Sequence, residues 1–450
     1  MAPGAPRLTR RAVAAWTAAG GGAALAACGR ADATAGQPAA PSAAPRTLKV
    51  AANTGGGYQL EQWKPIWAAW ERDHPNLKLD AMTGIASTDE FRVKLLTALA
   101  GGTVYDALHI HHVLSGEFMA KNLLQPLDQL IGKDREVRFD DFPTFLAAAY
   151  KWRGTQYGLP VEANPGAYFY NTELFARTGA RTPTEHARAG KWTWEQLLET
   201  ARELTRGQGE DKTWGFGQSS GRGTGYWGWD AWMPVVWSNG GDIWNKDVTA
   251  LALDSKEAIA GLQYYVDLIN KHQVAPPVDQ GPLWDHATGK IAMGLVKPFH
   301  VPQYKNYNWT PGMVVRPNGP AGAFHSAGSS MFGIFKGATQ RDDAWTWSKW
   351  FSDAGVRAVL DDGAFTAPPR KSLAQYKGWL ASRQPWEDAD VWAKATERLR
   401  LPLAVPGWDT VVNTFAKEFD QALLGKVGVA DAVQRAKPVI DQALKQEGVA

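Results

Sequence analysis

Residues 225–244 carry the densest group of side chains that could bind a ligand. The stretch GYWGWDAWMPVVWSNGGDIW contains five tryptophans and one tyrosine in twenty positions. Such rings can fill a core, lie at a membrane edge, stack on nucleobases, or pack against the C–H faces of sugar rings. Asp230 could accept hydrogen bonds from hydroxyl groups beside them. Trp237, in the apolar run MPVVW, and Trp244 are expected in the core or on the protein's surface.

Two further sites have titratable side chains. HIHH at 109–112 would place His109 and His111 on one face of a strand, but no third metal ligand follows at a useful spacing. Glu162 could be the general acid of a glycosidase, but no second carboxylate has a suitable context. The usual catalytic and nucleotide-binding motifs are absent. We therefore expect no enzymatic activity, no cofactor and no metal.

The charge distribution argues against nucleic-acid binding. The formal charge is +3, from 48 basic and 45 acidic residues. Arg7, Arg10 and Arg11 lie in the first 28 residues, which contain no acid, so the remainder has 45 residues of each sign. Because nucleic-acid binders depend on neutralising phosphates, a neutral body is not expected to be one.

The N-terminal segment predicts export and a lipid anchor. A basic start, a short Ala- and Gly-rich stretch and LAAC at 25–28 are typical of a lipoprotein signal peptide, and Thr9-Arg10-Arg11 resembles a twin-arginine signal. Cys28 is the only cysteine, which indicates lipidation rather than a disulfide. No other segment approaches the length of a membrane-spanning helix. We expect the protein to be anchored on the outer face of the bacterial cell membrane.

Periodicity predicts two α/β lobes. Strands at 47–52, 76–82 and 106–112 alternate with helices, the pattern of a doubly wound sheet. Ligands bind such sheets beyond the carboxyl ends of the strands. A second α/β lobe is expected to begin at 157–179, where Asn171 would cap a helix. The segment at 289–299 is expected to be a helix end or a strand, and two helices are expected near 409–425 and 429–446.

The order of these segments resembles the extracellular solute-binding proteins of bacterial ABC importers, a family that includes maltose-binding protein. The resemblance runs from Thr47 to Lys445 through phrases such as WAAWERDHPNLKL, KLLTALAGGTVYDAL, YGLPVEANPGAYFYNTELFARTG, KWTWEQLLETARELT, GKIAMG, AWTWSKWFSD and LLGKVGVADAVQRA. It implies a periplasmic-binding-protein-like fold of two doubly wound α/β lobes, joined by a hinge with a ligand cleft between them. The lobes would close on the solute without breaking a bond.

The resemblance also implies a domain order. Residues 1–28 would be the signal peptide and 29–46, rich in Ala, Pro, Gly and Ser, a flexible tether. Lobe 1 would comprise 47–160 and lobe 2 would comprise 161–325. The chain would return to lobe 1 at 326–372 and end with lobe 2 helices in 373–450.

Site residues follow from positions that match the family's pattern. Some supply stacking rings, some supply polar contacts from the first lobe, and others lie near the chain crossings. The expected ligand-binding residues are Asn53, Tyr58, His111, His112, Glu162, Trp227, Trp229, Asp230, Trp232, Phe299, His300, Ser329, Arg370 and Trp408, with Cys28 as the lipidation site.

The expected ligand is a carbohydrate, either a monosaccharide or an oligosaccharide, delivered to an ABC permease by a monomeric protein whose membrane contact is through lipid alone. The nearest alternative is another solute, such as a polyol, glycerol phosphate or a peptide. A phosphate would require clustered arginines in the cleft, which the sequence does not reveal. A surface-anchored enzyme acting on glycans and a structural adhesin are alternatives of other classes. TGGGY at 54–58 lacks a charged residue found in some oligosaccharide binders, which leaves the ligand's size open.

Overall fold

The computed structural model describes residues 45–53, 60–82, 85, 87–217, 228–361, 366–401 and 405–449, without the side chains of 60–62 and 282. Residues 44–450 form one compact unit. Cys28, the signal peptide, most of the tether, Tyr58 and Trp227 lie outside the described residues.

The larger sheet has five strands in the order β2-β1-β3-β12-β6. β1 is parallel to β2 and β3, whereas β12 is antiparallel to both of its neighbours. Every residue of β3 and β12 is buried, as expected for strands covered on both faces. The alternation of strands and helices expected for 47–112 is confirmed. The strands are β1 (Arg46–Ala52), β2 (Leu77–Ala81), β3 (Ala107–His111), β6 (Leu159–Pro160) and β12 (Ser330–Ile334).

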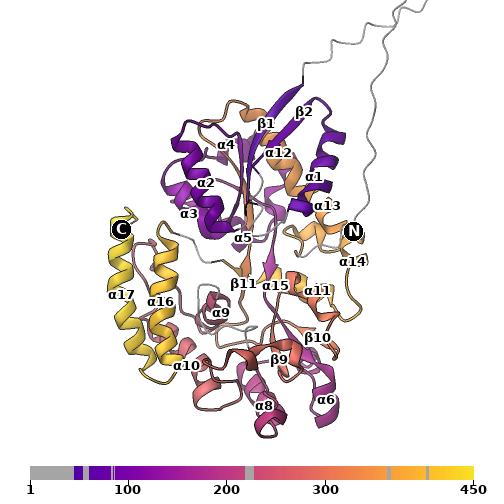
Figure 1. The fold of residues 1–450 in the computed structure, drawn as a ribbon, viewed down its shortest axis with the longest axis vertical. Coiled ribbons are helices and arrows are strands. Elements are labelled where there is room, and N and C mark those ends of the chain that lie inside the picture. Colours follow the sequence, from indigo (N-terminus) through magenta and orange to yellow (C-terminus); the bar gives the residue numbers. More distant parts are fainter. Residues whose placement is uncertain are drawn as a thin grey trace, which may run out of the picture. The chain divides into compact units, whose positions relative to one another are not determined.

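Helices cover both faces of this sheet. Figure 1 shows α2 and α3 on one side of β1, and α1, α12 and α13 on the other. Trp63 and Trp70 of α1 are fully buried. Trp70 packs edge-on against Trp347 at 4.9 Å. The helices are α1 (Leu60–Asp73), α2 (Thr88–Ala100), α3 (His112–Ala120), α12 (Arg341–Trp350) and α13 (Val356–Asp361), with a π-helical turn at Phe351–Gly355.

A second sheet is antiparallel, in the order β10-β8-β9. Asn171 is the last residue of β8. Its side chain accepts hydrogen bonds from the backbone N–H groups of Glu173 and Leu174, which confirms the expected cap of α6. The strands are β8 (Ala167–Asn171), β9 (Met293–Val296) and β10 (Pro311–Val314). The helices nearby in sequence are α6 (Thr172–Thr178), α7 (Pro183–Arg188), α8 (Trp194–Leu204), α9 (Trp229–Ser238) and α10 (Lys256–Asn270).

Helices α16 (Trp408–Leu423) and α17 (Val429–Gln446) are the two expected near the C-terminus. They lie side by side as the yellow pair in Figure 1 and pack extensively on one another. The shorter elements are α4 (Asp128–Lys133), α5 (Thr144–Ala148), β4 (Lys151–Trp152), β5 (Thr155–Gln156), α11 (Val301–Tyr304), α14 (Lys377–Ala381) and α15 (Ala389–Glu397).

Three chain segments join the two sheets. β7 (Asn164–Pro165) pairs with β11 (His325–Gly328), which also pairs with β13 (Leu399–Arg400). Ala163 forms a further bridge to Ala367. The chain passes from β11 to β12 through Ser329 alone. Segments from three distant parts of the sequence therefore lie side by side. The domain limits expected from the sequence stay predictions.

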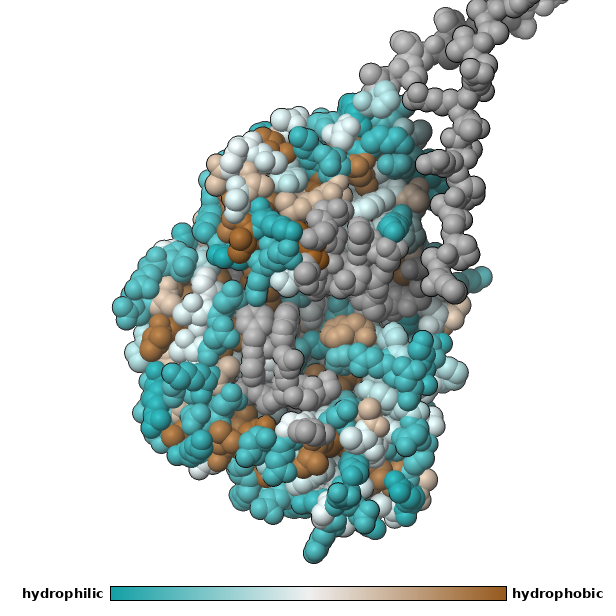
Figure 2. All heavy atoms as spheres, viewed as in Figure 1, coloured by the Kyte–Doolittle hydropathy of each residue, from teal (hydrophilic) through white to brown (hydrophobic). Residues whose placement is uncertain are grey.

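The face shown in Figure 2 is mainly hydrophilic, with hydrophobic side chains scattered over it. Among the residues that the structure describes, Phe299 is one of few large apolar side chains that are exposed, at 41%. None of the described helices combines the length and apolar character needed to cross a membrane.

Candidate functional site

Ser329, at the junction of β11 and β12, is the centre of a buried hydrogen-bond chain. Tyr150 Oη donates to Ser329 Oγ at 2.7 Å, and Ser329 Oγ donates to the carbonyl oxygen of Glu162 at 2.8 Å. The backbone N–H of His112 donates to the carbonyl oxygen of Ser329 at 2.9 Å. These bonds fix the crossing segments against the carboxyl end of β3.

The Glu162 side chain is only half satisfied. Its Oε1 accepts a hydrogen bond from Ser330 Oγ at 2.7 Å, while Oε2 is buried with no partner among the described residues. Burial raises the pKa of Glu162 to about 7, against the opposing effect of the Ser330 hydrogen bond. A buried oxygen without a partner is costly, so a ligand hydroxyl at this position would be stabilised.

His111 and His112 stand at the turn from β3 to α3, with ring centroids 4.4 Å apart. Burial lowers the pKa of both rings, to about 3 for His111, and the charge of Lys297 lowers both further. Both are therefore neutral near pH 7. Nδ1 of His112 lies 3.3 Å from the carbonyl oxygen of Ser329, and its buried Nε2 has no partner among the described residues.

The start of α9 brings an aromatic ring and an ion pair to these histidines. Trp229 is 1% exposed, and its ring lies edge-on to His112 at 5.5 Å. Asp230 forms a buried ion pair with Lys297, whose Nζ lies 5.1 Å from the centre of the Trp229 ring. Burial lowers the pKa of Lys297, and the Asp230 carboxylate opposes this. The carbonyl oxygen of Asp230 also accepts a hydrogen bond from Arg316 Nη2 at 2.9 Å.

Phe299 and His300 follow Lys297 directly. Lys297 Nζ lies 5.7 Å from the centre of the Phe299 ring, which contacts His300 edge-on at 4.5 Å. The pKa of His300 is lowered to about 3, first by burial and then by Lys297. We define the central cluster as Glu162, His111, His112, Trp229, Asp230, Lys297, Phe299, His300 and Ser329. It offers aromatic rings beside polar groups.

Among the described residues, no three side chains of His, Cys, Asp or Glu are grouped so that they could hold a metal ion. His109, the remaining member of the HIHH stretch, packs edge-on against Trp63 at 5.0 Å, inside the apolar interior of the larger sheet. What the central cluster can do is bind a polar molecule that has flat apolar faces.

The family model for bacterial extracellular solute-binding proteins matches residues 56–358. The chain belongs to this family. A binding protein from Brucella abortus is 25% identical to this solute-binding protein over 395 residues, which is 86% of this chain and 89% of the relative. The family description places its members outside the cell.

Solved structures show the same fold. The cyclic alpha-maltosyl-1,6-maltose binding protein from Arthrobacter globiformis has a TM-score of 0.75 at 20% identity, covering 89% of this chain and 100% of that chain. The sugar-binding protein MalE from Xanthomonas citri has a TM-score of 0.75 at 19% identity, covering 89% and 98%. This solute-binding protein therefore has the expected periplasmic-binding-protein-like fold of two α/β lobes.

Three expected site residues have contacts outside the central cluster of this solute-binding protein, and Asn53 lies beside the end of β3, where its backbone N–H donates to the carbonyl oxygen of His109 at 3.3 Å. Trp232 packs on Phe415 of α16 at 4.4 Å, and Trp408 lies 6.4 Å from Trp244. The guanidinium group of Arg370 donates to carbonyl oxygens of Ser352, Val137 and Arg138. The Asn53 side chain lies 3.5 Å from Thr88 Oγ1. Their roles as ligand contacts stay predictions, and the first three positions favour a packing role.

Sequence reasoning missed Lys297 of the central cluster, and Tyr150 and Ser330, which hydrogen-bond to its members. Lys297 stands alone in the apolar run AMGLVKPF, with its partner 67 residues away. Tyr150 and Ser330 have no local pattern that marks them as polar contacts. A charged residue in an otherwise apolar strand end was the one available signal, because buried charges are rarely left unpaired.

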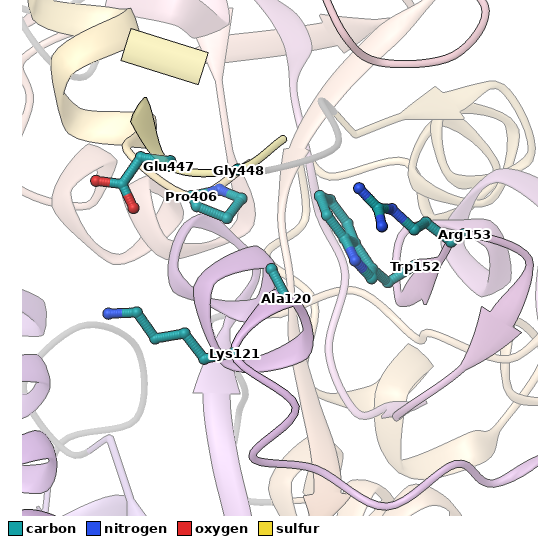
Figure 3. A pocket seen from close by; sticks show the side chains of 7 residues that line it. All are labelled: Ala120, Lys121, Trp152, Arg153, Pro406, Glu447 and Gly448. Atoms are coloured by element: carbon teal, nitrogen blue, oxygen red, sulfur yellow. The ribbon is translucent and has the colours of Figure 1, made fainter. Parts of the chain in front are cut away.

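A surface cavity of about 100 Å³ lies elsewhere. Figure 3 shows that its wall combines Trp152 and Arg153, whose side chains run side by side, with Pro406 and Gly448 near the C-terminus. Lys121 at its edge is held by Glu117 at 2.5 Å. None of its lining residues belongs to the central cluster.

Replacing Glu162 by glutamine is expected to make the solute-binding protein more stable at high pH. The folded-state pKa of about 7 lies above the ordinary glutamate pKa of 4.5, so the folded state holds this proton more tightly. The stability that Glu162 contributes is present below pH 4.5 and is lost as the pH rises through 7. Above that pH, Glu162→Gln should gain on the order of 3 kcal/mol at most, since one pKa unit corresponds to about 1.4 kcal/mol.

Denaturant unfolding of both proteins near pH 5 and near pH 8 measures this difference. The exposed acid Glu203, changed to glutamine, is the control and should not alter the pH dependence. Equal pH profiles for wild type and Glu162→Gln would show that the Glu162 carboxyl is solvated in solution.

Proposed function

We propose that this solute-binding protein captures a carbohydrate at the central cluster. The observation that carries the proposal is the pairing of the Trp229 and Phe299 rings with buried polar atoms around Lys297. Sugar rings have apolar C–H faces that pack on aromatic planes, and their hydroxyl groups both donate and accept hydrogen bonds. A neutral histidine, a carboxyl oxygen and an ammonium group meet both needs.

The two solved structures described above support this ligand class, because each is named for a sugar. The aromatic stretch at 225–244 supports it as well, since its residue Trp229 lies in the central cluster. Oligosaccharides and monosaccharides both fit the chemistry. No group in this proposal breaks a bond, so the protein acts by binding and release.

We infer that the captured sugar is handed to an ABC permease and that the protein is anchored by lipid at Cys28, as a monomer on the outer face of the cell membrane. The LAAC sequence and the Ala- and Pro-rich segment after it support the anchor. The mass of the mature N-terminus from membranes checks this: an unmodified Cys28 on exported protein would contradict it.

A panel of mono- and oligosaccharides is expected to include at least one that raises the melting temperature. A ligand that binds only the folded state, at a hundredfold excess over its Kd, stabilises it by about 2.7 kcal/mol. Phe299→Ala is the matched variant, because a ring that is 41% exposed contributes little to folding but would stack on the sugar.

The expected result is loss of the shift in Phe299→Ala at an unchanged melting temperature without sugar. If no sugar of the panel shifts the melting temperature but a polyol, glycerol phosphate or a peptide does, that solute would replace carbohydrate as the proposed ligand. Chromatography of the incubated sugars separates binding from catalysis, since a released product would identify an enzyme that acts on glycans.

A further inference from the structure

A cavity of about 270 Å³ lies beside β11 and β13, against the end of α15. Figure 1 shows α15 next to β11. A single water needs only about 15 Å³, so the cavity has room for a small polyatomic ligand together with water. The lining residues are Ala187, Gly190, Trp192, Val315, Arg316, Asn318, Ala323, His325, Lys394, Glu397 and Arg398. None of them is an expected sugar contact.

The charged residues in the lining are mainly cationic. Arg316, Lys394 and Arg398 face one acid, Glu397, and His325 adds no charge because burial lowers its pKa to about 3. The charges of Arg316 and Arg398 lower that pKa further. Positive charge is therefore concentrated at this cavity, although the body of the chain has no net charge.

Arg316 at this cavity is buried and incompletely satisfied. It is 3% exposed, and its Nη2 donates to the carbonyl oxygen of Asp230 at 2.9 Å. Its Nε is buried with no partner among the described residues. Because a buried guanidinium donor without an acceptor is costly, an acceptor at this position would be favoured.

The other two cations are at the mouth of the cavity. Lys394 and Arg398 are exposed on the last turn of α15 and just beyond it. A Cβ built on Gly322, which has φ +107°, would lie 2.9 Å from Arg398 Nη1. The arginine therefore folds over this glycine, next to the lining residue Ala323. The positive φ, which residues with a side chain rarely adopt, explains why the turn contains glycine.

We propose that this cavity is a second binding site, for a small oxyanion such as phosphate or sulfate, free or as an ester. A tetrahedral anion would accept from Arg316 in the floor and from Lys394 and Arg398 at the mouth. The site is separate from the central cluster, but Arg316 touches both because it also binds the Asp230 backbone. The proposal does not depend on which solute the central cluster binds.

Calorimetric titration with inorganic phosphate and with sulfate, in sodium chloride of matched ionic strength, tests the site in the whole protein. The Lys394→Met/Arg398→Met variant is expected to bind at least tenfold more weakly, since it loses the charge-assisted hydrogen bonds of two cations to the anion. Glu397→Gln should bind several-fold more tightly, because it removes the one acid from the lining. Glycerol 3-phosphate in the same titration distinguishes a phosphate ester from the free anion.

Arg188→Met is the matched control. Arg188 is an exposed cation between the lining residues Ala187 and Gly190 but does not line the cavity, so its loss should leave affinity within twofold. Equal losses from Arg188→Met and Lys394→Met/Arg398→Met would indicate diffuse attraction and overturn the proposal. So would anion binding that Phe299→Ala abolishes, because the anion would then occupy the central cluster, or no heat with any anion.

Discussion

Replacing Trp232 by alanine is expected to lower the free energy of unfolding by about 3–5 kcal/mol, as large-to-small core changes do. Trp232 is 2% exposed, and its ring packs against Phe415 at 4.4 Å, which joins α9 to α16. The cavity left between two helices could not collapse without moving one of them. Sugar affinity of the protein that still folds should remain within about twofold, because the ring packs against Phe415 of α16 rather than against a ring of the central cluster.

Trp229→Ala is the comparison within the same helix. It should cost some stability too, but it should also weaken sugar binding by on the order of 1–3 kcal/mol, the scale of an aromatic hot spot. Denaturant unfolding and titration of each variant measure the two effects. If Trp232→Ala loses affinity while Trp229→Ala does not, the assignment of the two rings must be exchanged.

Breaking the buried pair between Lys297 and Asp230 is expected to have an effect of similar size. Lys297→Met leaves the Asp230 carboxylate buried without its cation and should destabilise the fold by about 3–5 kcal/mol. The side chains of the pair are 5% and 11% exposed. The double variant Lys297→Met/Asp230→Asn removes both charges and should recover most of that stability.

The exposed pair of Lys78 and Glu71 gives the control. With side chains 51% and 39% exposed, it should lose less than about 1 kcal/mol in Lys78→Met. Unfolding free energies from denaturant titrations compare the four proteins. A double variant that is no more stable than Lys297→Met would show that shape and hydrogen bonding, rather than charge, hold this part of the cluster together.

The elements of the fold could be predicted where local patterns determine them. The alternating pattern at 47–112 located β1, β2 and β3, and the amide of Asn171 located the start of α6. The family resemblance located the region of Ser329. The sequence of α9 does not show which of its tryptophans faces the site. All of its residues are buried, and no polar side of the helix separates Trp229 from Trp232.

The central cluster, and the surroundings of Arg370 outside it, depend on contacts between distant segments. Lys297 forms an ion pair with Asp230, which lies 67 residues away in the sequence. Arg370 donates hydrogen bonds to carbonyl groups of residues 137, 138 and 352. A guanidinium group that satisfies backbone carbonyls looks the same in sequence as one that binds a ligand. Only the three-dimensional arrangement shows which acceptors lie within its reach.

The position of β12 between β3 and β6 also constrains the order in which the chain can fold. During synthesis, residues 46–160 are made long before residues 330–334, which supply the strand between β3 and β6. Until then, the edges of β3 and β6 have unpaired backbone groups that can join other chains. The larger sheet cannot be completed from the N-terminal residues alone. The growing chain must therefore be protected from aggregation until most of it has been made.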